Sequence, residues 1–402
     1  MVRSFRRNQE ILKYVFFAAA YLACPLVLRA QYVQQGPKLV GTGAIGESRQ
    51  GFSVALSGDG NTALVAGPGD DDSHGAVWVF VRSGSTWTQQ GGKLIAGDAV
   101  GRAVQGHSVA LSADGNTALV GGSYDSGGTG AAFVFVRSGA TWTQQGPKLV
   151  ATAGGGISVA LSADGNTALV GSWGDNSVAV FTRAGSTWRQ QGPKLVGSGA
   201  GYESYAGIAV VLSGDGNTAL IGGSVNGTRT TWAFTRSGSI WTEQAAILVG
   251  AAENPHQGTP LALSGDGNTA LIGSPFDSGA YQGALWVLSR SGTTWSQQGA
   301  KLVGTGAEGS YVLQGFSVAL SADGNTALIG GIYENNAAGA VWVFKRSGTS
   351  WSQQGQKFAG TGAFGIAGFG RSIALSADAG TALIGGSFDN HLVGAAWVFV
   401  RP

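Results

Sequence analysis

Seven copies of one sequence repeat, spaced 50 to 57 residues apart, predict an all-β chain that folds as a single seven-bladed β-propeller. The stretch GFSVALSGDGNTALVAG, from Gly51 to Gly67, is typical of the copies. Each copy consists of short segments rich in β-branched and aromatic residues, with tight turns between them and no helical period. The two ends of the repeat region supply complementary parts of one repeat, as a closed ring requires.

The first repeat shows why we expect four antiparallel strands, a to d, in each blade. The segments are Ser53–Leu56, Thr62–Ala66, Ala76–Arg82 and Trp87–Ile95. Strands a and b are joined by the sequence SGDGN, and strands c and d by SGST. Asp-Gly between apolar runs is a strong hairpin signal, because glycine adopts at little cost the positive φ that a tight turn needs.

Strand c is apolar on both of its faces, since three valines alternate with Trp78 and Phe80. An antiparallel sheet with one solvated face would instead alternate apolar and polar residues. Burial on both sides fits blades that are stacked between neighbours. The residues of strand a are small and mostly apolar, which suits the crowded axis of a propeller.

The ends of the repeat region predict how the ring closes. Residues 32–40 (YVQQGPKLV) match strand d, but no strands a, b and c precede them. The sequence ends with residues 397–402 (WVFVRP), which match strand c and have no strand d after them. We expect the N-terminal strand to complete the last blade, so that no blade keeps a bare edge.

Residues 1–30 differ from the repeats and read as a secretory signal peptide. A basic start is followed by an apolar run of 15 residues from Tyr14 to Leu28, and Ala30 offers a cleavage site. The run is shorter than the roughly 20 residues that a membrane span needs, so we expect no span in the mature chain. Cleavage after Ala30, lipidation at Cys24 and retention of the leader remain open.

Removal of the leader would change the chemistry of the chain. It would take away the only cysteine and leave 19 basic and 21 acidic residues. Disulfides, and the basic patch that nucleic-acid binding needs, are therefore not expected. We expect a monomer that is secreted or stands in the periplasm or at the cell surface.

Stretches such as GFSVALSGDGNTALVAGPGDDDSHGAVWVFVRSGSTWTQQ resemble the bacterial FG-GAP repeat, which is related to the propeller of integrin α subunits. The Phe-Gly dipeptide stands at Phe369-Gly370, and the GAP element survives in part as Ala66-Gly67-Pro68 and Gly273-Ser274-Pro275. The resemblance covers residues 31–402 and implies an interaction or adhesion module without catalytic activity. Integrin-type repeats often carry a calcium loop between strands a and b. Here that loop is a hairpin with one aspartate, so calcium is not carried over and no cofactor is expected.

Two features recur in every blade, which favours a role in the scaffold. One is the aspartate of the a–b turn, which we expect to cap its own backbone. These residues are Asp59, Asp114, Asp164, Asp215, Asp266, Asp323 and Asp378. The other is the arginine that ends strand c, followed five residues later by a tryptophan in six blades, which predicts a cation–π pair across the c–d hairpin.

The d–a and b–c connections differ between repeats and share one side of a propeller, here called the variable face. Loops on a rigid scaffold often carry binding residues, although they also vary when nothing constrains them. In the first b–c connection, clustered acids could bind calcium or form a solvated acidic loop. The candidate binding residues are Asp70, Asp71, Asp72, His74, Tyr124, Asp125, Trp173, Tyr202, Tyr205, Asp277, Tyr281, Tyr333, Glu334, Asp389 and His391. The same connections hold Glu47, Arg49, Asp175, Glu203, Tyr311 and Arg371.

Three functions are compatible with such a face. The first is a scaffold that binds a protein at the cell surface, as the family resemblance implies. The second is a lectin whose exposed aromatic residues stack on sugars. The third is a hydrolase or lyase with a site in the central funnel, which would need several titratable side chains around one pocket.

Overall fold

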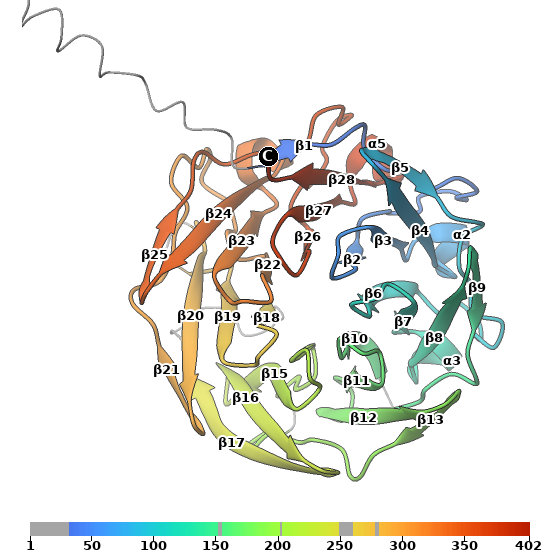
Figure 1. Cartoon of the computed structure of the whole chain (residues 1–402), viewed down its shortest axis with the longest axis vertical. Helices are drawn as coiled ribbons and strands as arrows, with labels where there is room; N and C mark the ends of the chain where they lie inside the picture. Colours follow the sequence, from blue (N-terminus) through green and yellow to red (C-terminus); the bar gives the residue numbers. More distant parts are fainter. Residues whose placement is uncertain (1–31, 152–154, 202, 249–259, 278–280) are drawn as a thin grey trace, which may run out of the picture.

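The computed structural model of the chain describes residues 32–151, 155–201, 203–248, 260–277 and 281–402. Over these residues, seven four-stranded antiparallel sheets stand in a ring around a central axis (Figure 1). The predicted all-β, seven-bladed propeller is therefore confirmed. The leader, residues 1–30, and the candidate residue Tyr202 lie outside the described residues.

Blade 1 follows the predicted order of strands. It consists of β2 (Ser53–Leu56), β3 (Thr62–Gly67), β4 (Ala76–Ser83) and β5 (Thr86–Gln89). The fourth strand is shorter than predicted, because a turn with Gly91 at φ 74° interrupts it. The chain rejoins the sheet at Leu94, which pairs with Val77 as an isolated bridge.

The other blades repeat this plan, with strand a of each blade nearest the axis in Figure 1. Blades 2 and 3 contain β6 (Gln105–Leu111), β7 (Thr117–Gly122), β8 (Ala131–Ser138), β9 (Thr141–Gln144), β10 (Gly155–Leu161), β11 (Thr167–Ser172), β12 (Ser177–Ala184) and β13 (Thr187–Gln190). Blades 4 and 5 contain β14 (Ala209–Leu212), β15 (Thr218–Val225), β16 (Thr228–Ser237), β17 (Ile240–Leu248), β18 (Leu261–Leu263), β19 (Thr269–Ser274), β20 (Ala284–Ser291) and β21 (Thr294–Gln297). Blades 6 and 7 contain β22 (Ser317–Leu320), β23 (Thr326–Gly331), β24 (Ala340–Ser347), β25 (Ser350–Gln353), β26 (Ser372–Leu375), β27 (Thr381–Gly386), β28 (Ala395–Val400) and β1 (Val33–Gln34).

The N-terminal strand closes the ring, as predicted. Strand β1 pairs antiparallel with β28 of blade 7, with Val33 opposite Val400. Tyr32 takes the place of the strand-d tryptophan of the other blades. Its ring lies 5.7 Å from the guanidinium carbon of Arg401, and its hydroxyl donates a 2.6 Å hydrogen bond to the carbonyl of Ala379.

A second closure device lies at the a–b turns. Each turn donates one backbone hydrogen bond to the next, from Gly58 N to Ala113 O (2.9 Å) around to Ala377 N and Gly58 O (2.9 Å). The seven bonds form an unbroken ring around the axis. In every copy the donor is Gly or Ala, because the turns pack closely: a Cβ on Gly58 would lie 3.3 Å from that of Ala113.

The core lies between the blades, because strand c is buried on both faces as predicted. Val77 and Val79 of β4 pack against blade 2, in a cluster with Phe133. Trp78 points the other way, into a cluster with Leu383 of blade 7. Each large apolar side chain buried in this way contributes about 1.5–3 kcal/mol to folding.

The a–b turn aspartates cap their own turns. In blade 1, Asp59 accepts hydrogen bonds from the Ser57 hydroxyl (2.5 Å) and from the backbone (3.0 Å) and side-chain (2.9 Å) N–H groups of Asn61. Partial burial opposes ionisation of Asp59, but these hydrogen bonds outweigh it and lower the pKa of the carboxyl. The predicted capping role is confirmed.

The predicted cation–π pairs form in six blades, with the arginine carbon 5.3 to 5.8 Å from the tryptophan ring. Five of these arginines also link neighbouring blades, namely Arg82, Arg137, Arg183, Arg236 and Arg346. Arg137 Nε donates to the Asn116 side chain in its own blade (2.9 Å), and its terminal nitrogen donates to Thr62 of blade 1 (3.1 Å). The repeated Arg-Trp motif is thus part of the scaffold.

Candidate functional site

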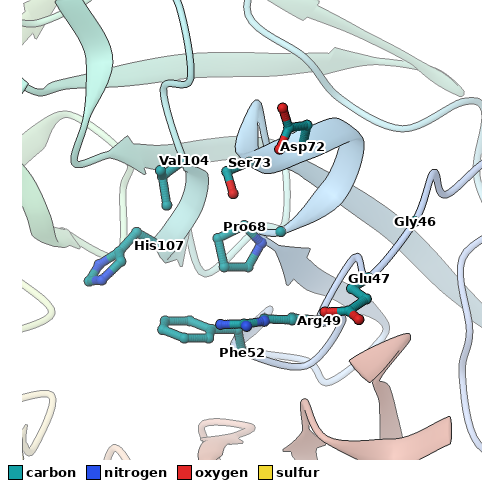
Figure 2. A pocket seen from close by; sticks show the side chains of 10 residues that line it. Gly46, Glu47, Arg49, Phe52, Pro68, Asp72, Ser73, Val104 and His107 are labelled. Carbon is teal, nitrogen blue, oxygen red and sulfur yellow. The ribbon is translucent and has the colours of Figure 1, made fainter. Parts of the chain in front are cut away.

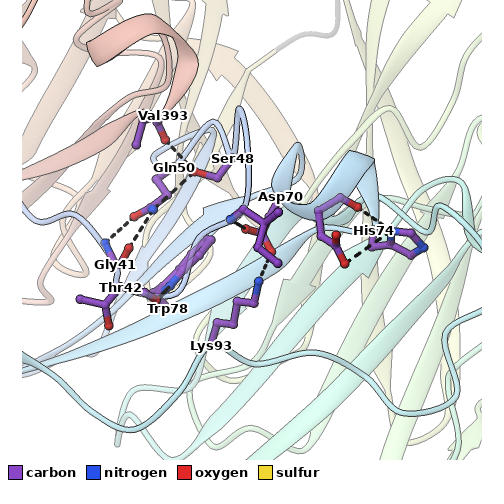
Figure 3. A network of polar contacts seen from close by, with 11 residues as sticks. Gly41, Thr42, Ser48, Gln50, Asp70, His74, Trp78, Lys93 and Val393 are labelled. Atoms are coloured by element: carbon purple, nitrogen blue, oxygen red, sulfur yellow. Dashed lines mark hydrogen bonds and ion pairs between the residues drawn. The ribbon is translucent and has the colours of Figure 1, made fainter.

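The d–a and b–c connections lie together on one side of the ring, so the structure assembles the variable face. In blade 1, Asp71 N donates to Ile45 O (3.0 Å) and Gly69 N donates to Ser48 O (3.2 Å). Figure 3 shows the polar contacts beneath this surface. Gln50 holds Gly41 through both of its amide atoms, and Trp78 Nε1 donates to Thr42 O (2.8 Å). These contacts fix the d–a connection against the blade.

Four b–c connections share an unusual backbone. In blades 1, 2, 6 and 7 they form the single turns α2 (Asp70–Ser73), α3 (Asp125–Gly128), α4 (Glu334–Ala337) and α5 (Asp389–Leu392). The residues after the leading acid adopt left-handed φ, such as 50° at Asp71 and 54° at Asp72. This conformation costs roughly 1–2 kcal/mol per residue and is best tolerated by Gly, Asn and Asp, which are common at these positions.

The acid that leads each of these turns is buried and paired with a lysine. Asp70 is fully buried and accepts hydrogen bonds from Lys93 Nζ (2.5 Å; Figure 3) and from Ile45 N (2.8 Å). The equivalent pairs are Asp125–Lys148, Glu334–Lys357 and Asp389–Lys38. The four acids were predicted from the sequence to lie on a binding surface. In the structure their carboxylates are buried and hold the loops of that surface in place. Direct ligand contact by them stays a prediction.

Blades 3 and 5 carry more exposed versions of the pair, Asp175–Lys194 and Asp277–Lys301. Blade 4 lacks both partners: its b–c turn contains Asn226 and Gly227 and no acid, and Ile247 stands where the other strands d have lysine. The two partners are therefore present together or absent together. This covariation between repeats was visible in the sequence and could have identified the pair.

The remaining polar candidates of blade 1 do not converge on one point. Asp72 is exposed and pairs with Arg102, and His74 Nδ1 lies 2.5 Å from the carbonyl oxygen of Asp71. Within the described ranges, no three His, Cys, Asp or Glu side chains come together to hold a metal ion. The first b–c connection thus contains one buried acid, Asp70, and two exposed acids, Asp71 and Asp72.

Aromatic candidates form pairs that bridge the two kinds of connection. Trp173 stacks on Tyr205 with ring centroids 6.4 Å apart, beside a 170 Å³ hollow that Glu203 and Asn176 also line. Tyr281 stacks on Tyr311 at 4.7 Å. Tyr124 is 60% exposed to solvent.

An apolar pocket of 520 Å³ lies on blades 6 and 7. The candidates Tyr333 and the exposed His391 line it, together with Phe364, Ile366, Phe388 and Leu392. Phe364 and Ile366 are 59% and 57% exposed. Neither residue is among those predicted from the sequence, although two large apolar residues in the glycine-flanked stretch GAFGIAG were a signal.

A second pocket, of 560 Å³, opens beside the axis between blades 1 and 2. Its lining includes Phe52, Pro68, Val104 and His107 and the charged side chains of Glu47, Arg49 and Asp72 (Figure 2). Burial lowers the pKa of His107, and the charge of Arg371 adds to this effect, while a hydrogen bond to Ile157 O opposes it.

Comparisons with known proteins agree with this architecture. Residues 87–135, from strand d of blade 1 to strand c of blade 2, match the FG-GAP repeat family. Hydrazine synthase of Kuenenia stuttgartiensis is similar in structure, with a TM-score of 0.62, 13% identity, and coverage of 90% of this chain and 99% of that one. A Bacteroides uniformis protein provisionally assigned as a 6-phosphogluconolactonase gives a TM-score of 0.54 and 15% identity, and covers 77% of this chain and 85% of its own. Likeness at such identity shows the fold alone.

The fold and the site define a seven-bladed β-propeller whose scaffold repeats from blade to blade and whose variable face does not. The matched repeat and this fold together fit a bacterial FG-GAP-type propeller. No curated protein matches the chain. In the part of the chain that the structure describes, no helix has the length and apolar character to cross a membrane.

Proposed function

We propose that the protein is an exported, non-catalytic scaffold that binds another protein through its variable face. The observation that carries this proposal is the apolar pocket on blades 6 and 7, with Phe364 and Ile366 held in solvent at its edge. Exposed apolar side chains around a hollow are typical of interaction surfaces. The opposite face instead repeats one hydrogen-bonded turn seven times.

The chemistry of the pocket favours an apolar or aromatic segment of the partner. Phe364, Ile366, Phe388 and Leu392 supply carbon surface, and Tyr333 and His391 add polar atoms at the rim. Full burial of Phe364 and Ile366 would contribute about 1.5–3 kcal/mol for each side chain. Loss of both contacts should therefore weaken binding more than ten-fold, because 1.4 kcal/mol corresponds to a factor of ten.

The test measures saturable binding of the labelled protein to intact cells and to surface extracts of the producing organism, and compares variants with the wild type. The variant Phe364→Ser/Ile366→Ser should lose at least ten-fold in affinity. The control Ile95→Ser removes a similarly exposed apolar residue after strand d, outside the pocket, and should bind like the wild type. Unchanged binding by the double variant, or no saturable binding by the wild type, would contradict the proposal.

A lectin is the second candidate, and the stacked pair Trp173–Tyr205 beside its hollow favours it. Aromatic faces suit the apolar face of a sugar ring, and Glu203 and Asn176 offer polar atoms next to them. A glycan array separates the two functions. Signals that disappear with Trp173→Ala and persist with Phe364→Ser/Ile366→Ser would favour the lectin, whereas a blank array would remove it.

A further inference from the structure

Arg371 differs from the residues at the equivalent position of the other blades, which lies next to strand a, the strand nearest the axis in Figure 1. It follows Gly370 and directly precedes strand a of blade 7, β26. The other described residues at this position are Phe52, His107, Ile157, Ile208 and Phe316. Arg371 is thus the one arginine among six described positions that otherwise hold apolar residues and a histidine.

Aromatic rings surround this arginine. Its guanidinium carbon lies 3.9 Å from the centroid of the Phe52 ring, which is a stacking distance. Phe316 and Phe388 each lie 5.7 Å away. Stacking covers the face of the guanidinium and leaves the N–H groups at its edge for a ligand in the same plane.

The charge of Arg371 has no counter-ion among the residues that the structure describes. Its Nε is buried and makes no hydrogen bond there. Burial lowers the pKa of Arg371 to about 10; the nearby Tyr333 side chain opposes this shift, and the positive charge of Arg49 adds to it. A half-buried cation that packs on aromatic rings but has no anionic partner is costly, so an anion that reached the guanidinium would be stabilised.

The surroundings indicate what carries the anion. Phe52 is also a wall of the 560 Å³ pocket in Figure 2, and Phe388 is also a wall of the 520 Å³ apolar pocket. Arg371 is not in the lining of either hollow, but it lies against one aromatic wall residue of each, Phe52 and Phe388. A group that pairs with it would be attached to an apolar body that fits one of these hollows.

We propose that Arg371 binds a carboxylate carried on an apolar group, either a free aromatic acid or the C-terminus of a peptide that ends in an aromatic residue. A carboxylate is planar and accepts two parallel hydrogen bonds from one guanidinium edge. The inference goes beyond the proposed function, because it names the chemical group that the variable face recognises.

The test uses the purified full chain and NMR titration with 3-phenylpropanoate and its uncharged amide. The peptide Gly-Gly-Phe, with a free or amidated C-terminus, tests the peptide source. The free acids should bind at least ten-fold more tightly than the amides. They should also shift the Nε–Hε signal of Arg371, whereas the amides should not.

Arg371→Met keeps an unbranched side chain against Phe52 and removes the charge, so the preference for acids over amides should disappear. Arg102→Met, which removes an exposed arginine from the same face, should leave that preference intact. An equal affinity of the wild type for acid and amide would overturn the proposal, as would acid binding without a shift of the Arg371 signal. These results are independent of partner binding by the Phe364→Ser/Ile366→Ser variant, so either proposal can fail alone.

Discussion

The buried acid–lysine pair gives the most direct test of how the variable face is held in place. In Asp70→Asn the side chain keeps its shape and one oxygen for Ile45 N, but it loses the charged hydrogen bond to Lys93. A hydrogen bond to a charged group contributes about 1.5–3 kcal/mol, and loss of one partner leaves the other charge uncompensated. Lys93 keeps 16% of its side chain exposed, so solvent recovers part of that cost. We expect a loss of about 2 kcal/mol in the free energy of unfolding.

Urea denaturation followed by tryptophan fluorescence measures this loss, and Asp72→Asn is the matched control. Asp72 lies in the same turn, but it is 71% exposed and pairs with an exposed arginine. Surface ion pairs contribute at most about 1 kcal/mol and often nothing measurable, so the control should change little. The double variant Asp70→Asn/Lys93→Met should be less destabilised than the sum of the single variants, because blade 4 folds with neither partner. If Asp70→Asn were as stable as Asp72→Asn, the carboxylate would not be fastening the loop.

Three further predictions concern the scaffold. Trp142→Ala should lower the free energy of unfolding in urea by about 1–3 kcal/mol, through loss of the ring contacts with Arg137 and Gln90. This is less than the loss expected for a fully buried tryptophan, because the Trp142 ring is half-buried. A denaturation curve like that of the wild type would contradict this. The a–b turn carboxyls have lowered pKa values in the fold, so their contribution is complete above the ordinary carboxyl pKa and is lost as pH falls through the folded value. Free energies of unfolding measured from about pH 6 down to about pH 2 should show this loss beginning at about pH 4, and Asp59→Asn should reduce it. Deletion of residues 32–40 should lower the melting temperature and cause self-association in size-exclusion chromatography, because β28 becomes a bare edge.

The fold could be predicted from the sequence because its signals are local and recur. The Asp-Gly turn between β2 and β3 sets a hairpin within a few residues, whatever surrounds it. Ring closure followed from counting strands, since Tyr32 begins a strand d that matches the missing edge of blade 7. The end of the fourth strand was placed wrongly, because the turn at Gly91 interrupts a pattern that otherwise continues to Leu94.

The candidate site was harder to predict, because exposure depends on partners far along the chain. Asp70 and Asp72 look alike in sequence, yet one meets a lysine 23 residues later and is buried, while the other faces solvent. The setting of Arg371 depends on rings that blades 1, 6 and 7 bring together, among them Phe52 and Phe316. Neighbours of this kind follow from the closed ring and not from any single repeat.

The position of the two larger pockets connects binding to closure of the ring. One pocket lies on blades 6 and 7 and the other between blades 1 and 2, so they lie on either side of the junction between blade 7, which the N-terminal strand completes, and blade 1. Arg371 of blade 7 contacts Phe52 of blade 1 and Phe316 of blade 6, and it thus spans both junctions of that blade. A ligand held there binds the closed ring and not an opened one, so at one hundred times its dissociation constant it would stabilise closure by about 2.7 kcal/mol. Loops on any blade could carry binding residues, but only at blade 7 would a ligand also strengthen the junction between the two ends of the chain.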